Sequence, residues 1–368
     1  MPKSFLIDII AGARPNFMKV APIIKILESR ASIDPILQYR LIHTGQHYDS
    51  KLSGSFFSQL GIPEPDINLK AGSGTQAEQT AAIMTRYEAV LLKTPADLCL
   101  VVGDVNSTMA CAITAQKSGI PVAHVEAGIR SGDWSMPEEI NRLVTDAITN
   151  FYFTTSEVAN KHLRDSGVGE RRIFFVGNTM IDTLLSNMSR LKRPAFWAQN
   201  NLLEKNYFVL TLHRPSNVDC GNRLHKVIDA ICKATLGRKV VFPIHPRTEQ
   251  RLRDEFQKPD NLIVVPPLPY LEFNFLVKHG MGVITDSGGV TEEATVLNIP
   301  CLTLRDSTER PETVTMGTNE LLGTDVTSIG PAVAKVLRGD WKSGMVPEKW
   351  DGKAAERIVC HLEEILNS

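Results

Sequence analysis

Short apolar runs rich in β-branched residues alternate along the chain with longer segments whose apolar residues recur every three to four positions. The short runs predict strands at 5–10, 37–43, 98–103, 122–126, 151–154, 173–176, 208–212, 240–244, 262–265, 282–285 and 301–304. The longer segments predict helices that include 18–27, 77–92, 108–117, 138–148, 224–234, 248–256, 292–297 and 354–366. Strands that alternate with helices are typical of parallel sheets, so we expect an α/β fold.

The alternation weakens over residues 188–204, which contain few β-branched residues. A chain of 368 residues suits two domains. We therefore expect an N-terminal domain over 1–178 and a C-terminal domain over 179–350. The last segment, 351–368, predicts a helix that packs back on the N-terminal domain.

Composition excludes several classes of protein. The chain has 40 Lys and Arg against 41 Asp and Glu, a net charge of −1, which gives no overall attraction to nucleic acid or to an anionic membrane. No apolar run reaches the length of a membrane-spanning helix. The six cysteines form no C-x-x-C pair, and most lie in apolar runs, so we expect a reducing compartment and a cytoplasmic protein.

A turn between a predicted strand and a predicted helix carries the sharpest chemical signal. Residues 285–293 read Thr-Asp-Ser-Gly-Gly-Val-Thr-Glu-Glu. The free N–H groups of a helix start, with Ser287, Gly288 and Gly289 around them, predict a site for a diphosphate. Glu293 follows one turn later, where it can accept hydrogen bonds from a ribose. The competing interpretation is an ordinary strand–helix turn with a Ser cap.

Acidic residues lie at or just beyond the ends of predicted strands: Asp104, Glu126 and Glu138. Paired carboxylates on opposite faces of a sugar carbon can serve acid–base chemistry at a C–H bond. Alternatively, Asp104 caps a helix and Glu138 pairs with Arg142 four residues later.

Basic residues and histidines at other strand ends are candidates for binding an anion. Arg14 and Lys19 follow the first strand and can neutralise a phosphate, or can be ordinary surface cations. His213, at the end of the first strand of the second half, can assist a leaving phosphate, and His245 is an analogous but weaker candidate. A structural role at the strand end is the alternative for both.

Other patterns are weaker or argue against a cofactor. The run 305–312, with Arg310, holds two arginines and three acids, which favours a sugar- or phosphate-binding network over a solvated loop. The Gly-x-Gly-x-x-Ala match at 72–77 does not follow a strand of a βαβ unit, so no nicotinamide cofactor is expected. His43 and His47 have no third ligand at suitable spacing, so no metal is expected.

Taken together, these motifs resemble the non-hydrolysing UDP-N-acetylglucosamine 2-epimerases. The resemblance rests on the runs 12–15, 102–104, 124–130, 137–139, 176–179, 212–214, 243–245, 285–289 and 308–312, which cover nearly the whole chain. It implies two Rossmann-like domains with parallel sheets facing a central cleft, the glycosyltransferase-B-like arrangement, in which the C-terminal domain binds UDP. It also implies a homodimer in polysaccharide biosynthesis, with no cofactor and no metal.

The resemblance implies an enzyme that interconverts UDP-GlcNAc and UDP-ManNAc by elimination of UDP to a 2-acetamidoglucal and its re-addition. By resemblance, Asp104, Glu126 and Glu138 are the acid–base carboxylates and His213 assists the leaving UDP. The residues matching substrate contacts are Arg14, Lys19, Arg130, His245, Ser287, Gly288, Gly289, Glu293 and Arg310.

Two related activities stay open. One is the epimerisation of a UDP-2,3-diacetamido-glucuronic acid, which an extra cation near the sugar 6-position would favour. The other is a hydrolysing epimerase that releases ManNAc and UDP. At 46–49 the chain reads Gln-His-Tyr-Asp, so the resemblance does not extend to a regulatory site with a Gln-His-x-Gln run.

Overall fold

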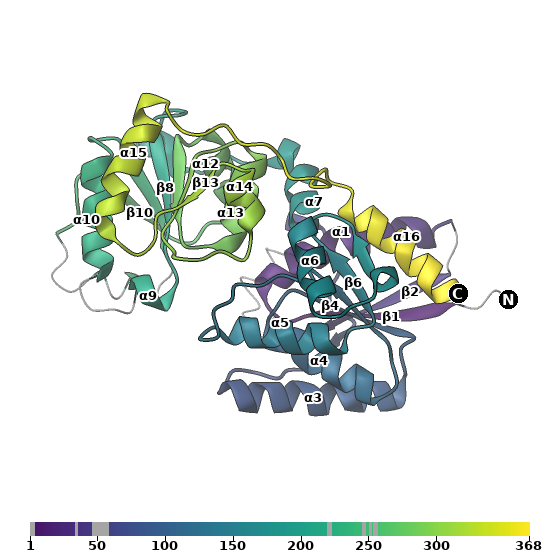
Figure 1. Ribbon diagram of the computed structural model, residues 1–368. Coiled ribbons are helices and arrows are strands. Elements are labelled where there is room, and N and C mark those ends of the chain that lie inside the picture. The colour runs from purple at the N-terminus through teal and green to yellow at the C-terminus, as the bar shows by residue number, and fades with distance from the viewer. Residues whose placement is uncertain are drawn as a thin grey trace. The chain divides into compact units, whose positions relative to one another are not determined.

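The computed structural model describes residues 4–33, 36–45, 59–218, 223–244, 248–249, 252 and 257–368. The chain forms two compact units: residues 1–186 with 348–368 make unit 1, and residues 187–347 make unit 2. Each unit is a parallel sheet whose strands alternate along the chain with helices, so the predicted α/β class is confirmed (Figure 1).

The sheet of unit 1 has the strand order β3-β2-β1-β4-β5-β6-β7, and its neighbouring strands are parallel. The strands are β1 (Phe5–Ala11), β2 (Leu37–His43), β3 (Ile67–Asn68), β4 (Leu98–Val102), β5 (Val122–Val125), β6 (Phe151–Thr154) and β7 (Ile173–Phe175). All five residues of β4 are buried, as expected of a central parallel strand that is covered on both faces.

Helices cover both faces of this sheet (Figure 1). They are α1 (Arg14–Ala31), α3 (Gln76–Lys93), α4 (Asn106–Lys117), α5 (Pro137–Ile148), α6 (Glu157–Asp165), α7 (Thr179–Ser186) and α16 (Ala354–Asn367), with a short 3-10 turn, η1 (Glu170–Arg172). Helix α3 has a capping box: Thr75 accepts from the Glu78 backbone N–H, and Glu78 accepts from the Thr75 backbone N–H.

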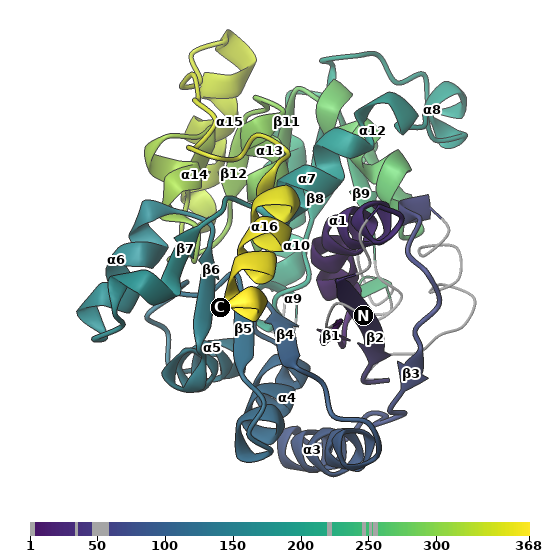
Figure 2. The same ribbon diagram turned by 90° about the vertical axis from the view of Figure 1, so that its right-hand side faces the viewer.

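The C-terminal helix α16 belongs to unit 1 and contacts α1 and α7 (Figure 2). Asp182 on α7 accepts hydrogen bonds from the backbone N–H groups of Ala354 and Ala355, at 3.2 and 2.7 Å, and so caps the first turn of α16. Trp350 is 1% exposed, and its indole N–H donates to the carbonyl of Thr155. These contacts fix the end of the chain on unit 1.

The sheet of unit 2 has the strand order β10-β9-β8-β11-β12-β13, again parallel. The strands are β8 (Tyr207–Thr211), β9 (Lys239–Pro243), β10 (Leu262–Val265), β11 (Gly282–Thr285), β12 (Cys301–Thr303) and β13 (Asn319–Leu321). The helices are α8 (Phe196–Gln199), α9 (Pro215–Val218), α10 (Arg223–Ala234), α12 (Tyr270–His279), α13 (Gly288–Val296), α14 (Pro311–Thr315) and α15 (Ile329–Arg338), with 3-10 turns η2 (Met188–Arg190) and η3 (Val326–Ser328).

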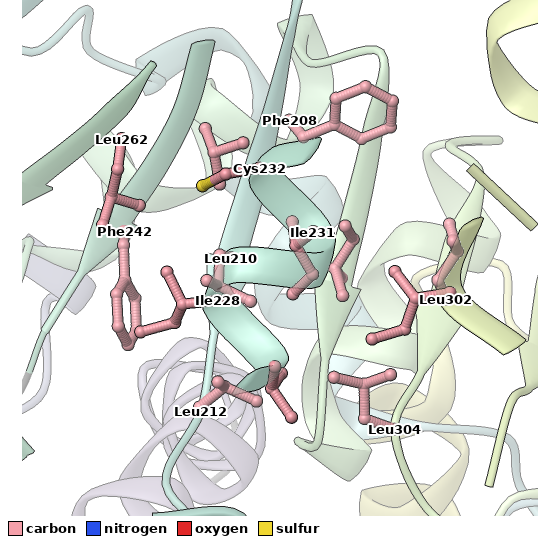
Figure 3. Packing of buried hydrophobic residues seen from close by; sticks show 14 of the residues in the cluster. Phe208, Leu210, Leu212, Ile228, Ile231, Cys232, Phe242, Leu262, Leu302 and Leu304 are labelled. Atoms are coloured by element: carbon pink, nitrogen blue, oxygen red, sulfur yellow. The ribbon is translucent and has the colours of Figure 1, made fainter. Parts of the chain in front are cut away.

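The strands of unit 2 contribute side chains to two apolar layers, one on each face of the sheet, because successive side chains of a strand point to opposite faces. Leu210 packs with Ile228 and Ile231 of α10 in one layer (Figure 3). Val209, its neighbour in β8, packs with Leu276 of α12 in the other. Because both layers are apolar, β8 shows no alternation of apolar and polar residues.

The sequence pattern predicted the strands of both sheets except β3 and β13. Strands β3 and β13 lie at sheet edges and hold one apolar residue each, so neither shows the apolar run that predicted the three-residue strands β7 and β12. Helices α6, α7, α12 and α15 were not among the predicted helices, and α1 begins at Arg14, four positions before the predicted start. Most of the predicted helix 248–256 lies outside the described residues.

Candidate active site

In unit 1, the candidate residues gather where β1, β4 and β5 end. The carboxyl ends of neighbouring parallel strands meet at one edge of the sheet, and this edge is where open α/β sheets bind ligands. The Lys19 ammonium, from α1, forms an ion pair with Oε2 of Glu126, the residue after β5. The side chain of Glu126 is 3% exposed. The structure therefore brings a predicted phosphate-binding cation and a predicted acid–base carboxylate together.

The backbone of Glu126 is in the left-handed region, with φ of 72°. A residue other than glycine rarely adopts this conformation, and such residues cluster at functional sites. Gly103, after β4, also has a positive φ, and a Cβ placed on it would lie 3.1 Å from Nζ of Lys19 and 3.6 Å from Oε2 of Glu126. The absence of a side chain at Gly103 leaves room for the pair.

Asp104 is held by an arginine that reaches it from α5. Arg142 donates to Oδ2 of Asp104 from Nε at 3.0 Å and from Nη2 at 2.6 Å, and it also donates to Glu139. Asn141 donates to the backbone carbonyl of Asp104. The N-cap residue of α4 is Val105 rather than Asp104, and the side chain of Asp104 pairs with Arg142.

Glu139, the neighbour of the predicted Glu138, is buried in the first turn of α5. It accepts hydrogen bonds from Ser131 and from the backbone N–H of Gly132, and it pairs with Arg142. Burial opposes its ionisation, but these contacts outweigh burial and hold the pKa of Glu139 below its usual value. Glu138 is half-buried and has no ion-pair partner among the described residues, so the alternative pairing with Arg142 is not formed.

Arg130 lies in a different network from the carboxylates. Its Nη1 donates to Asp146 at 2.6 Å, and Asp146 also contacts Nδ1 of the fully buried His124 at 2.8 Å. The other nitrogen of His124 contacts the carbonyl of Gly103. Asp146 is deeply buried, yet the contacts with His124 and Arg130 outweigh the burial and lower its pKa. The network thus links Arg130 to the backbone next to Asp104.

The turn after β1 depends on a residue that the sequence did not single out. Arg14, the predicted phosphate ligand, opens α1. Oδ1 of Asn16 accepts from the backbone N–H groups of Gly12 and Ala13, at 3.3 and 2.9 Å, and its amide donates to the carbonyl of Val102. A Cβ on Gly12 would lie 1.9 Å from Oγ of Ser107, so only glycine fits there.

In unit 2, the candidate residues gather where β8 and β11 end. Nδ1 of His213 lies 2.7 Å from Oδ1 of Asp286, and the side chain of His213 is 55% exposed. Helix α13 begins at Gly288 directly after Ser287, with Gly289 in its first turn. The N–H groups of a first turn have no partners within the helix and are free for an anion.

Glu293, on α13, is 3% exposed. Its Oε1 accepts from the Tyr270 hydroxyl at 2.7 Å and from the Asn274 amide at 3.3 Å. Burial raises the pKa of Glu293 to about 7, against the effect of these two hydrogen bonds. Glu293 therefore changes charge near neutral pH.

The charged run 305–312 splits into two buried ion pairs. Arg305 binds Glu309 with two hydrogen bonds of 2.9 and 2.7 Å, and a Cβ on Gly288 would lie 4.0 Å from Nη1 of Arg305. Arg310 donates instead to Glu292 on α13. The run is therefore not a solvated loop, and Arg305 is the arginine next to Gly288.

We expect Glu293→Gln to stabilise unit 2 at pH 8 but not at pH 5. A glutamate in the unfolded chain ionises near pH 4.5, whereas Glu293 in the folded protein ionises near pH 7. The folded state binds the extra proton between these values, so the stability present below pH 4.5 is lost as the pH rises through 7. The loss is about 3 kcal/mol by the usual conversion. Burying the extra amide N–H of Gln costs about 1 kcal/mol.

The net gain in the free energy of unfolding is then about 2 kcal/mol at pH 8. Urea denaturation of both proteins at the two pH values measures it. Glu272→Gln, on helix α12, is the matched control. An equal difference between Glu293→Gln and wild type at both pH values would contradict the expectation.

The sequence analysis did not single out Asn16, Glu139 or Asp286, and it named Arg142 only as an alternative partner of Glu138. Asp286 stands inside the run that predicted the diphosphate site, and Glu139 and Arg142 have the i, i+3 spacing of a helical ion pair, so both signals were present. His245 and His47 lie outside the described residues. Among the described residues, no group of His, Cys, Asp and Glu is arranged to hold a metal ion, and no helix there is long and apolar enough to cross a membrane.

Comparison with known proteins gives a consistent result. Residues 30–363 match the model of the UDP-N-acetylglucosamine 2-epimerase family. The UDP-N-acetylglucosamine 2-epimerase of Methanocaldococcus jannaschii is 42% identical, over 96% of this chain and 97% of that relative. The UDP-2,3-diacetamido-2,3-dideoxy-D-glucuronate 2-epimerase of Pseudomonas aeruginosa is 36% identical, over 97% and 99%.

A solved structure is also similar. The crystal structure of the Methanocaldococcus jannaschii UDP-GlcNAc 2-epimerase in complex with UDP-GlcNAc and UDP has a TM-score of 0.86 and 40% identity, covering 98% of this chain and 99% of that one.

Proposed function

The chain belongs to the UDP-N-acetylglucosamine 2-epimerase family, and from this premise we propose that it interconverts UDP-GlcNAc and UDP-ManNAc. The observation that carries the proposal is the pair of anchored carboxylates at one sheet edge, Glu126 with Lys19 and Asp104 with Arg142. Acid–base chemistry at a sugar carbon needs carboxylates held in fixed positions.

In the proposed reaction, the bond from carbon 1 to the phosphate oxygen breaks, and its electrons leave with UDP. The C–H bond at carbon 2 breaks as a carboxylate takes the proton, and its electrons form the double bond of a 2-acetamidoglucal. A carboxylate then returns a proton to the opposite face of carbon 2, and UDP adds back at carbon 1. Glu126, Asp104 and Glu138 are the proposed acid–base groups.

Unit 2 is proposed to hold the nucleotide. The first turn of α13, with Ser287, Gly288 and Gly289, supports a diphosphate site, because free N–H groups and the helix dipole both favour an anion. Glu293 is proposed to accept from the ribose hydroxyls, and His213 to assist the leaving phosphate.

Cations are proposed to neutralise the phosphates or to hold the sugar: Arg14, Lys19, Arg130, His245 and Arg310. Lys19 also pairs with Glu126.

The proposal extends to a homodimer that serves polysaccharide biosynthesis, which rests on the family alone, and to a cytoplasmic location, which rests on the absence of C-x-x-C pairs and on cysteines in apolar runs. Light scattering on the purified protein tests the dimer.

Proton NMR of the protein with UDP-GlcNAc in deuterated water tests the activity. We expect UDP-ManNAc that carries deuterium at carbon 2. Free ManNAc with UDP would assign the hydrolysing reaction instead. If UDP-GlcNAc is unchanged and a UDP-2,3-diacetamido-glucuronic acid is epimerised, the activity is that of the Pseudomonas aeruginosa relative.

A further inference from the structure

Asp286 is a buried carboxylate to which the mechanism has so far given no task. It follows β11 and is 0% exposed. Its oxygens accept from the backbone N–H of His213 at 3.1 Å, from the backbone N–H of Arg214 at 3.0 Å and from the Asn217 amide at 3.1 Å. Nδ1 of His213 lies 2.7 Å from Oδ1. A fully buried carboxylate with this many donors is rigidly placed.

The same contacts determine which nitrogen of His213 is available. A carboxylate only accepts hydrogen bonds, so Nδ1 of His213 carries a hydrogen. Nε2 is then the nitrogen left for a ligand, and the His213 side chain is 55% exposed. Burial opposes the ionisation of Asp286, but the contacts with His213, Arg214 and Asn217 outweigh it and lower its pKa, so Asp286 is an anion at neutral pH.

We propose that Asp286 is a positioning residue that acts through His213, a role that rests on the proposed function. The carboxylate fixes the ring with Nδ1–H inward and stabilises the imidazolium whose Nε2–H donates to the departing phosphate. As the bond from carbon 1 breaks, the proton on Nε2 passes to the phosphate oxygen and leaves a neutral imidazole. In the reverse direction, Nε2 takes this proton back when UDP adds to carbon 1.

Two other charged residues near His213 have opposite effects on a positive charge on its ring. Arg214, the next residue, is positively charged and so disfavours a positive charge on the ring. Its Nη2 lies 3.6 Å from Oε1 of Glu309, and this carboxylate offsets the charge of Arg214. Asn217, from α9, contributes a neutral amide to Asp286. Among the residues that the structure describes, the buried Asp286 is the charged group that pairs with the His213 ring, at 2.7 Å.

A purely structural role is the alternative, because Asp286 also anchors the backbone of His213 and Arg214. The variant Asp286→Asn separates the two roles. Its carbonyl oxygen can keep the hydrogen bonds from the backbone and from Asn217. Its amide N–H₂ then faces Nδ1 of His213 and can only donate, which forces the ring hydrogen to Nε2.

Nitrogen-15 NMR of the His213 ring at pH 8 measures which ring nitrogen carries the hydrogen. We expect hydrogen on Nδ1 in the wild type, and hydrogen on Nε2 with none on Nδ1 in Asp286→Asn, with the ring assigned through His213→Asn. Asp229→Asn, an exposed position on α10 in the same unit, is the charge-matched control and should leave the ring unchanged. An unchanged ring in Asp286→Asn would overturn the proposal, whatever the activity of the protein.

Turnover gives the second readout. Loss of a correctly placed general acid lowers turnover by about 100-fold or more, and we expect this for Asp286→Asn with little change in UDP affinity. In a His213→Asn background, Asp286→Asn should cost nothing further, because the two residues act as a unit. A full additional loss in the double variant would show that Asp286 acts independently of His213 and would overturn the proposal.

The two readouts keep this proposal separate from the proposed function. If the wild type epimerises no UDP-sugar, the function proposal fails, while the ring measurement still tests whether Asp286 sets the state of His213. If Asp286→Asn does not fold, the comparison of wild type with His213→Asn decides instead. Equal turnover in that pair would leave Asp286 nothing to act through and would overturn the proposal.

Discussion

We expect Glu126→Gln to lower the turnover of UDP-GlcNAc by about 100-fold or more, because Glu126 is a proposed general acid or base and such a group contributes at least that factor. Gln preserves the size of the side chain but cannot take or return a proton. The left-handed backbone of Glu126, with φ of 72°, and its ion pair with Lys19 place the carboxylate at the sheet edge. Stopped assays of UDP-ManNAc formation and deuterium incorporation at carbon 2 both measure the effect.

Asp104→Asn should show a loss of similar size, since Arg142 holds Asp104 at the same edge. The matched control is Glu88→Gln on the exposed face of α3, which should be fully active. Near-native turnover in Glu126→Gln would remove this residue from the mechanism. Retained deuterium exchange with slow product formation would instead assign Glu126 to the step after proton removal.

Replacing Arg40 with Ala destabilises unit 1 by about 3–5 kcal/mol, because it leaves a buried carboxylate without its partner. Asp8, in the centre of β1, is 0% exposed, and Arg40 on β2 binds both of its oxygens at 2.7 and 2.9 Å. Tyr87 donates a further hydrogen bond to Asp8. Burial raises the pKa of Asp8 even with Arg40 present. The measurement is the free energy of unfolding in urea at pH 8.

The pH dependence of Arg40→Ala gives an internal check. Without Arg40, the pKa of Asp8 rises further, and Asp8 takes up a proton on folding, so the deficit shrinks as the pH falls. The double variant Asp8→Asn with Arg40→Met removes both charges and should be closer to wild type than Arg40→Ala alone. A double variant less stable than Arg40→Ala would mean that the charges themselves stabilise the sheet.

The residues predicted to form the candidate site follow the ends of predicted strands, and a general property of parallel sheets explains why such residues lie near one another. Parallel strands bring their carboxyl ends to one edge, so residues distant in sequence such as Asp104 and Glu126 meet there. The sequence could also predict that a helix begins after Ser287, where an anion site is proposed, because a helix start is a local feature. It could not rank Glu138 against Glu139, since both acids begin the same helix and only packing buries Glu139.

The sequence by itself determined the α/β class, most strands, the family resemblance and the residue types of the site, because these depend on local periodicity and on short motifs. Only the tertiary structure decided which charges meet: Lys19 with Glu126, Arg142 with Asp104, and Asp286 with His213. It also decided that Glu293 is buried beneath Tyr270 and Asn274, which moves its ionisation toward neutral pH. Ion pairing and desolvation depend on distance and burial in space, and residues far apart in the chain acquire both only when the sheets and helices pack.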